Sequence, residues 1–200
     1  MRVGVLASGA GTNLQAILDR VHARGGVQVV AVGSDQPGAP ALERAARAGI
    51  ETAEFPAGAD RAARDAAIAD WLEARGVELV VLAGYMALLD PAFLARFPQR
   101  VINVHPALLP AFPGLRAIEQ ALDYGVKVFG VTVHFVDEGV DTGPVIAQRA
   151  VELPDATDPA AVREALRPLE HDLLCEAVEL IAAGAVALDP ERPRRVVIRR

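Results

Sequence analysis

Two polar side chains, Asn103 and His105, lie at the end of an apolar segment and are followed directly by Pro106. Side chains two apart in an extended strand point to the same face, so the carboxamide and the imidazole are expected to project together. A carboxamide donates hydrogen bonds to a developing oxyanion, and an imidazole transfers protons near neutral pH. A single Asn or His at a strand end is more often structural, so a catalytic role needs support from other segments.

A glycine-rich segment, residues 8–13, follows the first apolar run and precedes apolar residues at helical spacing. Small residues let a ligand approach the backbone, and the start of a helix attracts an anion such as phosphate. Only Gly9 and Gly11 of a GxGxxG pattern are present, because Leu14 occupies the third position. The segment predicts either a phosphate site or a tight turn with Thr12 or Asn13 as the helix N-cap.

The elements that must position these residues alternate between strand and helix over the first half of the chain. Apolar runs predict strands at residues 3–7, 27–32, 50–54 and 77–83, and helical patterns fall at 41–48 and 60–75. This alternation predicts an α/β fold with a doubly wound, mostly parallel sheet and helices on both faces. Ligands bind at the carboxyl ends of such strands. The glycine-rich segment, the loop of residues 84–89 that follows the strand 77–83, and His105 would all lie at this edge.

The pattern changes after residue 126. Residues 128–136 and 145–151 predict two antiparallel strands joined by a short loop, 137–144, whose acidic residues are either turn formers or functional groups. Helical residues then run from about 158 to 184, and Pro168 permits a break or a new first turn.

Composition excludes several classes of protein. A chain of 200 residues with 52% apolar residues predicts one domain, and its longest nearly apolar run, 79–89, is too short to span a membrane. A first strand without a signal region predicts a cytoplasmic protein. A net charge of −6 disfavours nucleic acid as a partner. Cys175 alone makes no internal disulfide, and the four scattered histidines predict no metal site.

Two groups of arginines leave alternatives open. Arg61 and Arg64 fall in the first turns of a predicted helix, where they are either solvated or placed to meet an anion. The C-terminal arginines are expected to be solvated or to make an accessory contact; they are Arg192, Arg194, Arg195, Arg199 and Arg200.

Five motifs in order together resemble the glycinamide ribonucleotide formyltransferases of purine biosynthesis. They span residues 8–15, 82–86, 103–110, 130–134 and 141–144. The resemblance implies a Rossmann-like formyltransferase fold and transfer of a formyl group from 10-formyltetrahydrofolate to the amine of glycinamide ribonucleotide. Asn103 would then stabilise the oxyanion, His105 would support that charge or transfer protons, and Asp141 would hold His105 or a relay water. A supporting structural role is expected for Thr132 and His134.

The resemblance also implies the binding residues. Substrate-binding residues would be Gly11, Thr12 and Asn13 with Arg61 at the phosphate and Glu170 at the ribose. The folate would contact Tyr85, Met86, Ala87, Leu88, Leu89, Val140 and Asp141. Residues 1–100 would form a nucleotide-binding half, 101–190 a catalytic and folate-binding half, and 191–200 an Arg-rich tail of one domain. Small-molecule substrates and a monomer or homodimer are expected, with no metal, nucleic acid or membrane. Ala87 and Ala111 stand where basic residues are frequent, which leaves the contacts of the folate tail open.

Two other functions remain in competition. A formyltetrahydrofolate hydrolase would use the same formyl chemistry, but such enzymes carry an additional N-terminal domain, whereas residue 1 already begins the first strand. Enzymes that formylate initiator tRNA or a sugar nucleotide usually carry a further domain as well. A non-catalytic nucleotide- or folate-binding module would not require Asn103, His105 and Asp141 together.

Overall fold

The computed structural model describes residues 1–56, 58 and 60–199, so Arg200 of the predicted tail lies outside the described residues. The chain consists of two compact units, which are Met1–Asn103 and Val104–Arg200. The predicted fold is confirmed: a mostly parallel sheet with helices is followed by an antiparallel strand pair.

The first unit contains parallel strands in the order β3-β2-β1-β4-β5. Their bounds are β1 Arg2–Leu6, β2 Gln28–Ser34, β3 Glu51–Glu54, β4 Leu79–Leu82 and β5 Val101–His105, whose last two residues belong to the second unit. Every residue of β4 is buried, as expected for a strand covered on both faces. Because the strands are parallel, their carboxyl ends lie along one edge of the sheet.

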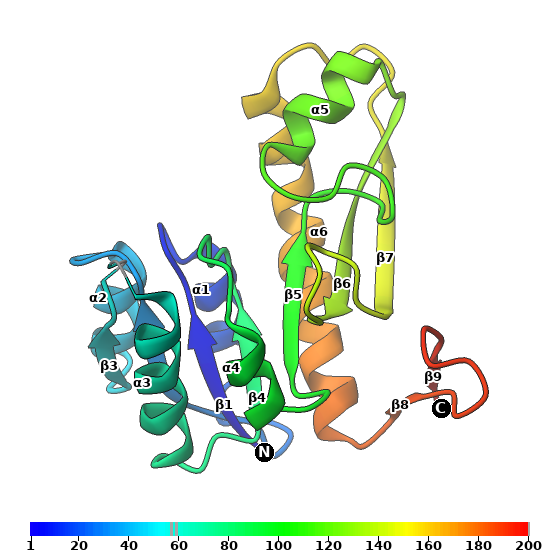
Figure 1. Ribbon diagram of the computed structural model, residues 1–200. Coiled ribbons are helices and arrows are strands. Elements are labelled where there is room, and N and C mark those ends of the chain that lie inside the picture. The colour runs from blue at the N-terminus through cyan, green and yellow to red at the C-terminus, as the bar shows by residue number, and fades with distance from the viewer. Residues whose placement is uncertain (57, 59, 200) are drawn as a thin grey trace. The chain divides into compact units, whose positions relative to one another are not determined.

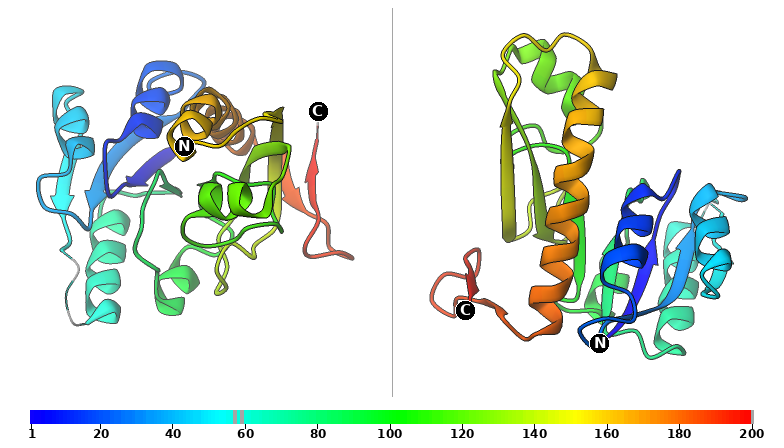
Figure 2. Two further views of the ribbon diagram at one scale, coloured as in Figure 1. Left: turned by 90° about the horizontal axis from the view of Figure 1, so that it is seen from above. Right: turned by 180° about the vertical axis from the view of Figure 1, so that it is seen from behind.

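Helices cover both faces of this sheet, with α1 and α2 on one face and α3 and α4 on the other (Figures 1 and 2). Their bounds are α1 Thr12–Arg20, α2 Pro40–Arg47, α3 Arg61–Glu73 and α4 Pro91–Arg96. Asp60 caps α3 and Asp90 caps α4, each by accepting a backbone N–H bond. The sequence did not predict α4, because a helix of six residues is too short to show a periodic pattern.

The second unit is built on the antiparallel pair β6 Val128–Phe135 and β7 Val145–Glu152. Helix α5 spans Ala117–Tyr124, and helix α6 spans Pro159–Ala182 and packs along both strands (Figure 2, right). The break that Pro168 permits does not occur. Leu166 and Leu173, on either side of the exposed Pro168, are both buried, so packing along the whole helix outweighs the lost N–H bond.

The chain ends in a small antiparallel hairpin, β8 Val186–Leu188 and β9 Val196–Ile198, which begins directly after α6 (Figure 1). This hairpin, residues 186–198, was not predicted from the sequence because its strands have only three residues each. Across the described part of the chain, no helix combines the length and apolar character that a membrane span requires.

Candidate functional site

His105 and Asp141 contact each other in the second unit. Nδ1 of His105 lies 3.3 Å from Oδ2 of Asp141, although the residues are 36 positions apart in the sequence. His105 is buried at the end of β5, and only 13% of the Asp141 side chain is exposed. The structure therefore brings together two of the three predicted catalytic residues within one unit.

Asp141 is held in an unusual backbone conformation. Its φ of 53° lies in the left-handed region, which aspartate tolerates better than most residues. Its Oδ2 accepts the Gly114 amide at 2.7 Å, and Nε2 of His134 lies 3.5 Å from Oδ1. Burial alone would raise the pKa of Asp141, but the bonds from His134 and Gly114, with the His105 and His134 charges, lower it to about 2. Asp141 is consequently an anion at neutral pH.

The His105 ring lies between two acceptors. Its Nε2 donates to the Phe112 carbonyl oxygen at 2.8 Å, while its Nδ1 faces the Asp141 carboxylate. A neutral imidazole carries one N–H, so it satisfies one of these acceptors, whereas the imidazolium donates to both. The ring is therefore held between these two acceptors, at the end of the strand that carries Asn103.

His134 contacts Asp141 directly, beyond the supporting role expected from the sequence. Its Nδ1 donates to the Phe135 carbonyl oxygen at 2.8 Å, which directs Nε2 toward Oδ1 of Asp141. The alternation of β6 placed His134 and Thr132 on one face, but only the return of the chain at Asp141 reveals this contact. Thr132 has the structural role expected: its buried hydroxyl accepts the Leu109 N–H and donates to the Ala107 carbonyl.

The loop that carries Asp141 is tied to itself and to β6. Oδ1 of Asp137 accepts the Gly139 N–H at 3.1 Å and the Thr142 hydroxyl at 2.6 Å. The Phe135 N–H donates to the Pro144 carbonyl at 2.9 Å. Asp137 is thus a turn former, one of the two roles predicted for the loop's acidic residues.

The predicted phosphate site lies at the start of α1, in the first unit. Gly11 is the N-cap, with φ 70°, so the alternative in which Thr12 or Asn13 caps the helix is wrong. A Cβ on Gly11 would come within 2.8 Å of Ala41, so glycine is required by both backbone conformation and space. Thr12 and Asn13 form the first helical turn, where backbone N–H groups point out of the helix end.

Arg61, which was expected to bind the substrate phosphate, contacts a carboxylate in this structure. It begins α3, is half exposed, and forms an ion pair with Asp90 at 3.4 Å. Arg64, one turn further, pairs with the fully buried Asp65 and donates to the Leu88 carbonyl. The Asp90 N–H donates to Asp65 at 2.6 Å, so the first turns of α3 hold the loop after β4.

That loop, residues 84–90, contains the folate-binding residues predicted for the first unit. The Ser8 hydroxyl accepts the Met86 N–H at 2.8 Å and donates to Asp35 at 2.5 Å, which joins the loop to the glycine-rich segment. Tyr85 is buried, and burial raises the pKa of its phenol, which stays neutral at physiological pH. Ala87 and Leu89 are partly buried.

Three apolar side chains predicted to contact folate are exposed. Met86 and Leu88 are 62% and 59% exposed in the first unit, and Val140 is 47% exposed beside Asp141 in the second. Large apolar side chains with this exposure offer contact area to a flat ring. Asn103 is partly buried near the end of β5, and Glu170 is partly buried on α6.

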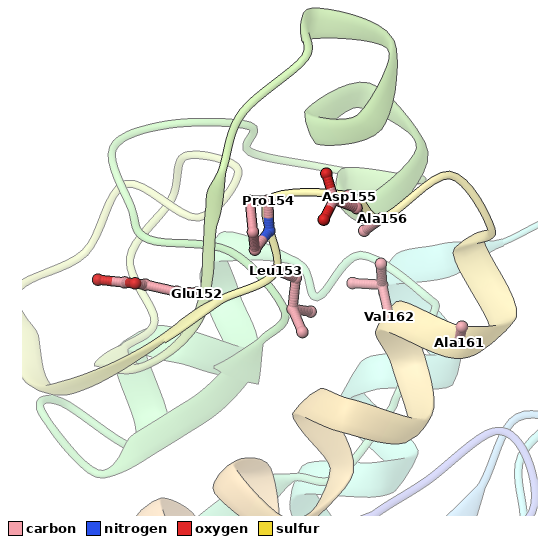
Figure 3. Close-up of a pocket in the computed structure, with 7 residues that line it drawn as sticks. All are labelled: Glu152, Leu153, Pro154, Asp155, Ala156, Ala161 and Val162. Atoms are coloured by element: carbon pink, nitrogen blue, oxygen red, sulfur yellow. The ribbon is translucent and has the colours of Figure 1, made fainter.

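A hollow of about 300 Å³ lies elsewhere in the second unit, between the end of β7 and the start of α6 (Figure 3). Its lining is mainly apolar and includes Leu153, Pro154 and Val162. None of the predicted site residues lines it. Within the described residues, no group of three or more potential metal ligands is present either.

Comparison with known proteins identifies relatives over nearly the whole chain. A family model described as formyl transferase matches residues 1–178. A phosphoribosylglycinamide formyltransferase of Mycobacterium tuberculosis is 44% identical over 189 residues, which cover 94% of this chain and 87% of the relative. The human trifunctional purine biosynthetic protein adenosine-3 is 40% identical over 190 residues, 94% of this chain and 19% of that longer protein.

Solved structures agree with these relatives. Glycinamide ribonucleotide transformylase 1 from Symbiobacterium toebii superposes with a TM-score of 0.93 at 48% identity, covering 100% of this chain and 94% of that one. A formyltetrahydrofolate deformylase from Pseudomonas syringae has a TM-score of 0.91 at 25% identity, but this chain covers only 66% of it. With the predicted motifs in place on this fold, the chain belongs to the formyl transferase family.

Proposed function

We propose that this protein transfers a formyl group from 10-formyltetrahydrofolate to the amine of 5-phosphoribosylglycinamide, a step of purine biosynthesis. The observation that carries the proposal is the His105–Asp141 pair, 3.3 Å apart, in a chain of the formyl transferase family. Formyl transferases use a folate-derived formyl donor, which supplies an electrophilic carbonyl carbon. The amine attacks this carbon, the tetrahedral intermediate collapses with cleavage of the bond to N10 of the folate, and one proton passes from the amine to N10. The residues of this chain must then stabilise one negative charge and transfer one proton.

Asn103 and His105 are the residues that stabilise the negative charge on the formyl oxygen. They are two residues apart on β5, so their side chains project from the same face of the strand. When the amine attacks, the formyl oxygen gains negative charge; the Asn103 carboxamide donates a hydrogen bond to it, and His105 supports the same charge from the next position on this face of the strand. Oriented donors of this kind contribute roughly 100- to 1,000-fold each to the rate.

Asp141 is the group that accepts the proton of the attacking amine. Its carboxylate is an anion at neutral pH because its pKa is held at about 2, and it contacts both His105 and His134. Such a carboxylate holds the His105 ring in its orientation, and it accepts a proton from the attacking amine directly or through a water.

Binding of the ribonucleotide phosphate is assigned to the start of α1. The backbone N–H groups of Gly11, Thr12 and Asn13 suit a dianion, and Gly11 has no side chain to cover them. Arg61 attracts the phosphate from a longer distance through its positive charge, although the ion pair with Asp90 partly neutralises that charge. Glu170 on α6 is assigned to the ribose hydroxyls, which a carboxylate accepts as hydrogen bonds.

The chain's residues fit a folate ring. The exposed Met86, Leu88 and Val140 side chains supply apolar contact area, and the 85–89 loop and the 137–141 loop supply backbone donors and acceptors. Ala87 and Ala111 give no positive charge for a glutamate tail, so we expect weak discrimination between tail lengths.

The remaining assignments follow from this activity. Residues 1–100 serve mainly the nucleotide, residues 101–190 carry catalysis and part of the folate site, and 191–200 form the Arg-rich tail. Both substrates are small molecules, and the enzyme works in the cytoplasm as a monomer or homodimer without a metal.

Acceptor dependence tests the proposal. The purified protein is mixed with 10-formyltetrahydrofolate, with and without glycinamide ribonucleotide, and loss of the donor is followed by absorbance. Consumption that requires the ribonucleotide supports the transferase. Consumption without it supports the hydrolase, and binding of both compounds without turnover supports a non-catalytic module; either result refutes the proposed function.

Substitution of His105 tests whether this side chain takes part in the reaction. His105→Ala is expected to lose at least about 100-fold in kcat while still binding the ribonucleotide, because the phosphate-binding groups lie on α1. Full activity of this variant would remove His105 from the mechanism.

A further inference from the structure

The C-terminal hairpin, residues 186–198, contacts the loop that carries Asp141. The Arg194 guanidinium donates from Nη2 to the backbone carbonyl of Thr142 at 2.7 Å. Beside it, Arg195 and Val145 form a single parallel β-bridge. Thr142 follows Asp141 directly, and Val145 is the first residue of β7, so the hairpin holds the loop at two points. The family match ends at residue 178, before the hairpin begins.

The hairpin is itself attached firmly to the end of α6. The Asp189 N–H donates to the Arg195 carbonyl at 2.8 Å, and the Arg199 N–H donates to the Ala185 carbonyl at 2.8 Å. The Arg195 guanidinium also lies 3.9 Å from the Asp189 carboxylate. These bonds close the hairpin and attach it to the end of α6, so they fix the position of Arg194 relative to that helix.

The other backbone anchor of the loop lies toward β6. The Phe135 N–H, which donates to the Pro144 carbonyl, joins the loop to the end of that strand, whereas the Asp137 bonds close the loop on itself. A Cβ on Gly143 would lie 1.8 Å from the Phe135 carbonyl, so the chain already presses against β6 at this point. The Asp141 side chain is held by Gly114 and His134, and its backbone lies between the β6 anchor and the Thr142 carbonyl that Arg194 binds.

We infer that the hairpin acts as a strap, a segment that holds the Asp141 loop in place. Arg194 is its positioning residue, because the bond that it donates to the Thr142 carbonyl fixes Asp141 against His105. A charge-assisted bond to a backbone carbonyl is among the stronger hydrogen bonds, and it leaves the side chain of Thr142 free to bind Asp137. Small displacements of a catalytic group lower a rate strongly, so the strap acts on kcat. The inference deepens the proposed function and rests on it.

Three variants of the full-length protein test the strap. Arg194→Met keeps the aliphatic chain and removes every donor, and Arg194→Lys restores one donor. Arg192→Met removes another guanidinium of the same tail and leaves the Arg194 bond in place. For Arg194→Met we expect kcat to fall about 3- to 30-fold, with the KM for the ribonucleotide within about twofold. Arg194→Lys recovers to within about threefold of the wild type, and Arg192→Met is unchanged.

The Gly114 amide gives a readout that does not depend on turnover. This N–H donates to Oδ2 of Asp141, so its hydrogen exchange, measured by NMR, reports whether Asp141 is in place. We expect exchange at Gly114 to be about tenfold faster in Arg194→Met than in the wild type or Arg192→Met.

Unchanged kcat or unchanged Gly114 exchange in Arg194→Met would overturn the strap. If the wild type shows no formyl transfer, the proposed function fails, and the Gly114 comparison still decides whether Arg194 positions Asp141.

Discussion

Replacing Asp141 with Asn removes the charge from the centre of the site and little else. Asparagine accepts the left-handed backbone at this position as readily as aspartate, and its amide oxygen can still accept the Gly114 N–H. The change therefore separates the carboxylate's charge from its shape. We expect kcat for formyl transfer to fall roughly 100- to 10,000-fold, because the His105 ring loses its orienting anion and the amine loses its proton acceptor.

The same variant carries a prediction about stability. The pKa of Asp141 is lowered from 3.8 to about 2, and a lowered carboxyl pKa stabilises the folded protein at every pH above the unfolded value. That contribution is lost as pH falls from about 4 to about 2, when the folded carboxylate is finally protonated. The pKa difference corresponds to at most about 2 kcal/mol, and partial solvent exposure reduces this to roughly 1–2 kcal/mol.

Urea denaturation of both proteins at pH 7, 4 and 2.5 measures this contribution. The free energy of unfolding of the wild type should exceed that of Asp141→Asn by about 1–2 kcal/mol more at pH 7 than at pH 2.5. A difference between the proteins that is independent of pH, together with unchanged kcat, would refute the assignment of Asp141 as the buried anion of the site.

Three further substitutions test other parts of the structure. Gly11→Ala should destabilise the protein by about 2 kcal/mol or more and raise the KM for the ribonucleotide, because the left-handed φ is lost and Cβ would press on Ala41; thermal unfolding and steady-state kinetics measure both effects, and a wild-type Tm would contradict the first. Thr132→Val should cost about 2–4 kcal/mol in chemical denaturation, since it leaves the buried Leu109 N–H and its other partners unpaired; a loss below about 0.5 kcal/mol would show that they find new partners. Glu170→Gln should raise the KM for glycinamide ribonucleotide about tenfold with a smaller change in kcat, and an unchanged KM would remove Glu170 from the ribose site.

Much of the fold could be predicted because it depends on local patterns. The buried parallel strands are continuous apolar runs, and the main helices repeat apolar residues at helical spacing with clear stops such as Gly49 and Gly76. Helices α4 and α5 and the C-terminal hairpin were missed, because they are short and their stability comes from packing. The effect of Pro168 was also undecidable locally, since burial on both sides of it keeps α6 continuous.

The site was predictable only in part. The two-residue spacing on β5 placed Asn103 and His105 on one face, but pairing His105 with Asp141 came from the family resemblance. That contact depends on the register of β6 and β7 and on a left-handed residue in the loop, neither of which has a periodic signal. The same holds for the His134 contact to Asp141, and for the Gly114 contact to Asp141 and the Arg194 bond to Thr142, which join residues far apart in sequence.

The central claim is that the site delivers a formyl group to an amine rather than to water. A donor carrying ¹³C in the formyl group, incubated with the protein and glycinamide ribonucleotide, allows the fate of that carbon to be followed by NMR. The account predicts that the label appears in the new amide of the ribonucleotide, one equivalent for each donor consumed. Label that accumulates as free formate, at a rate indifferent to the ribonucleotide, would contradict it.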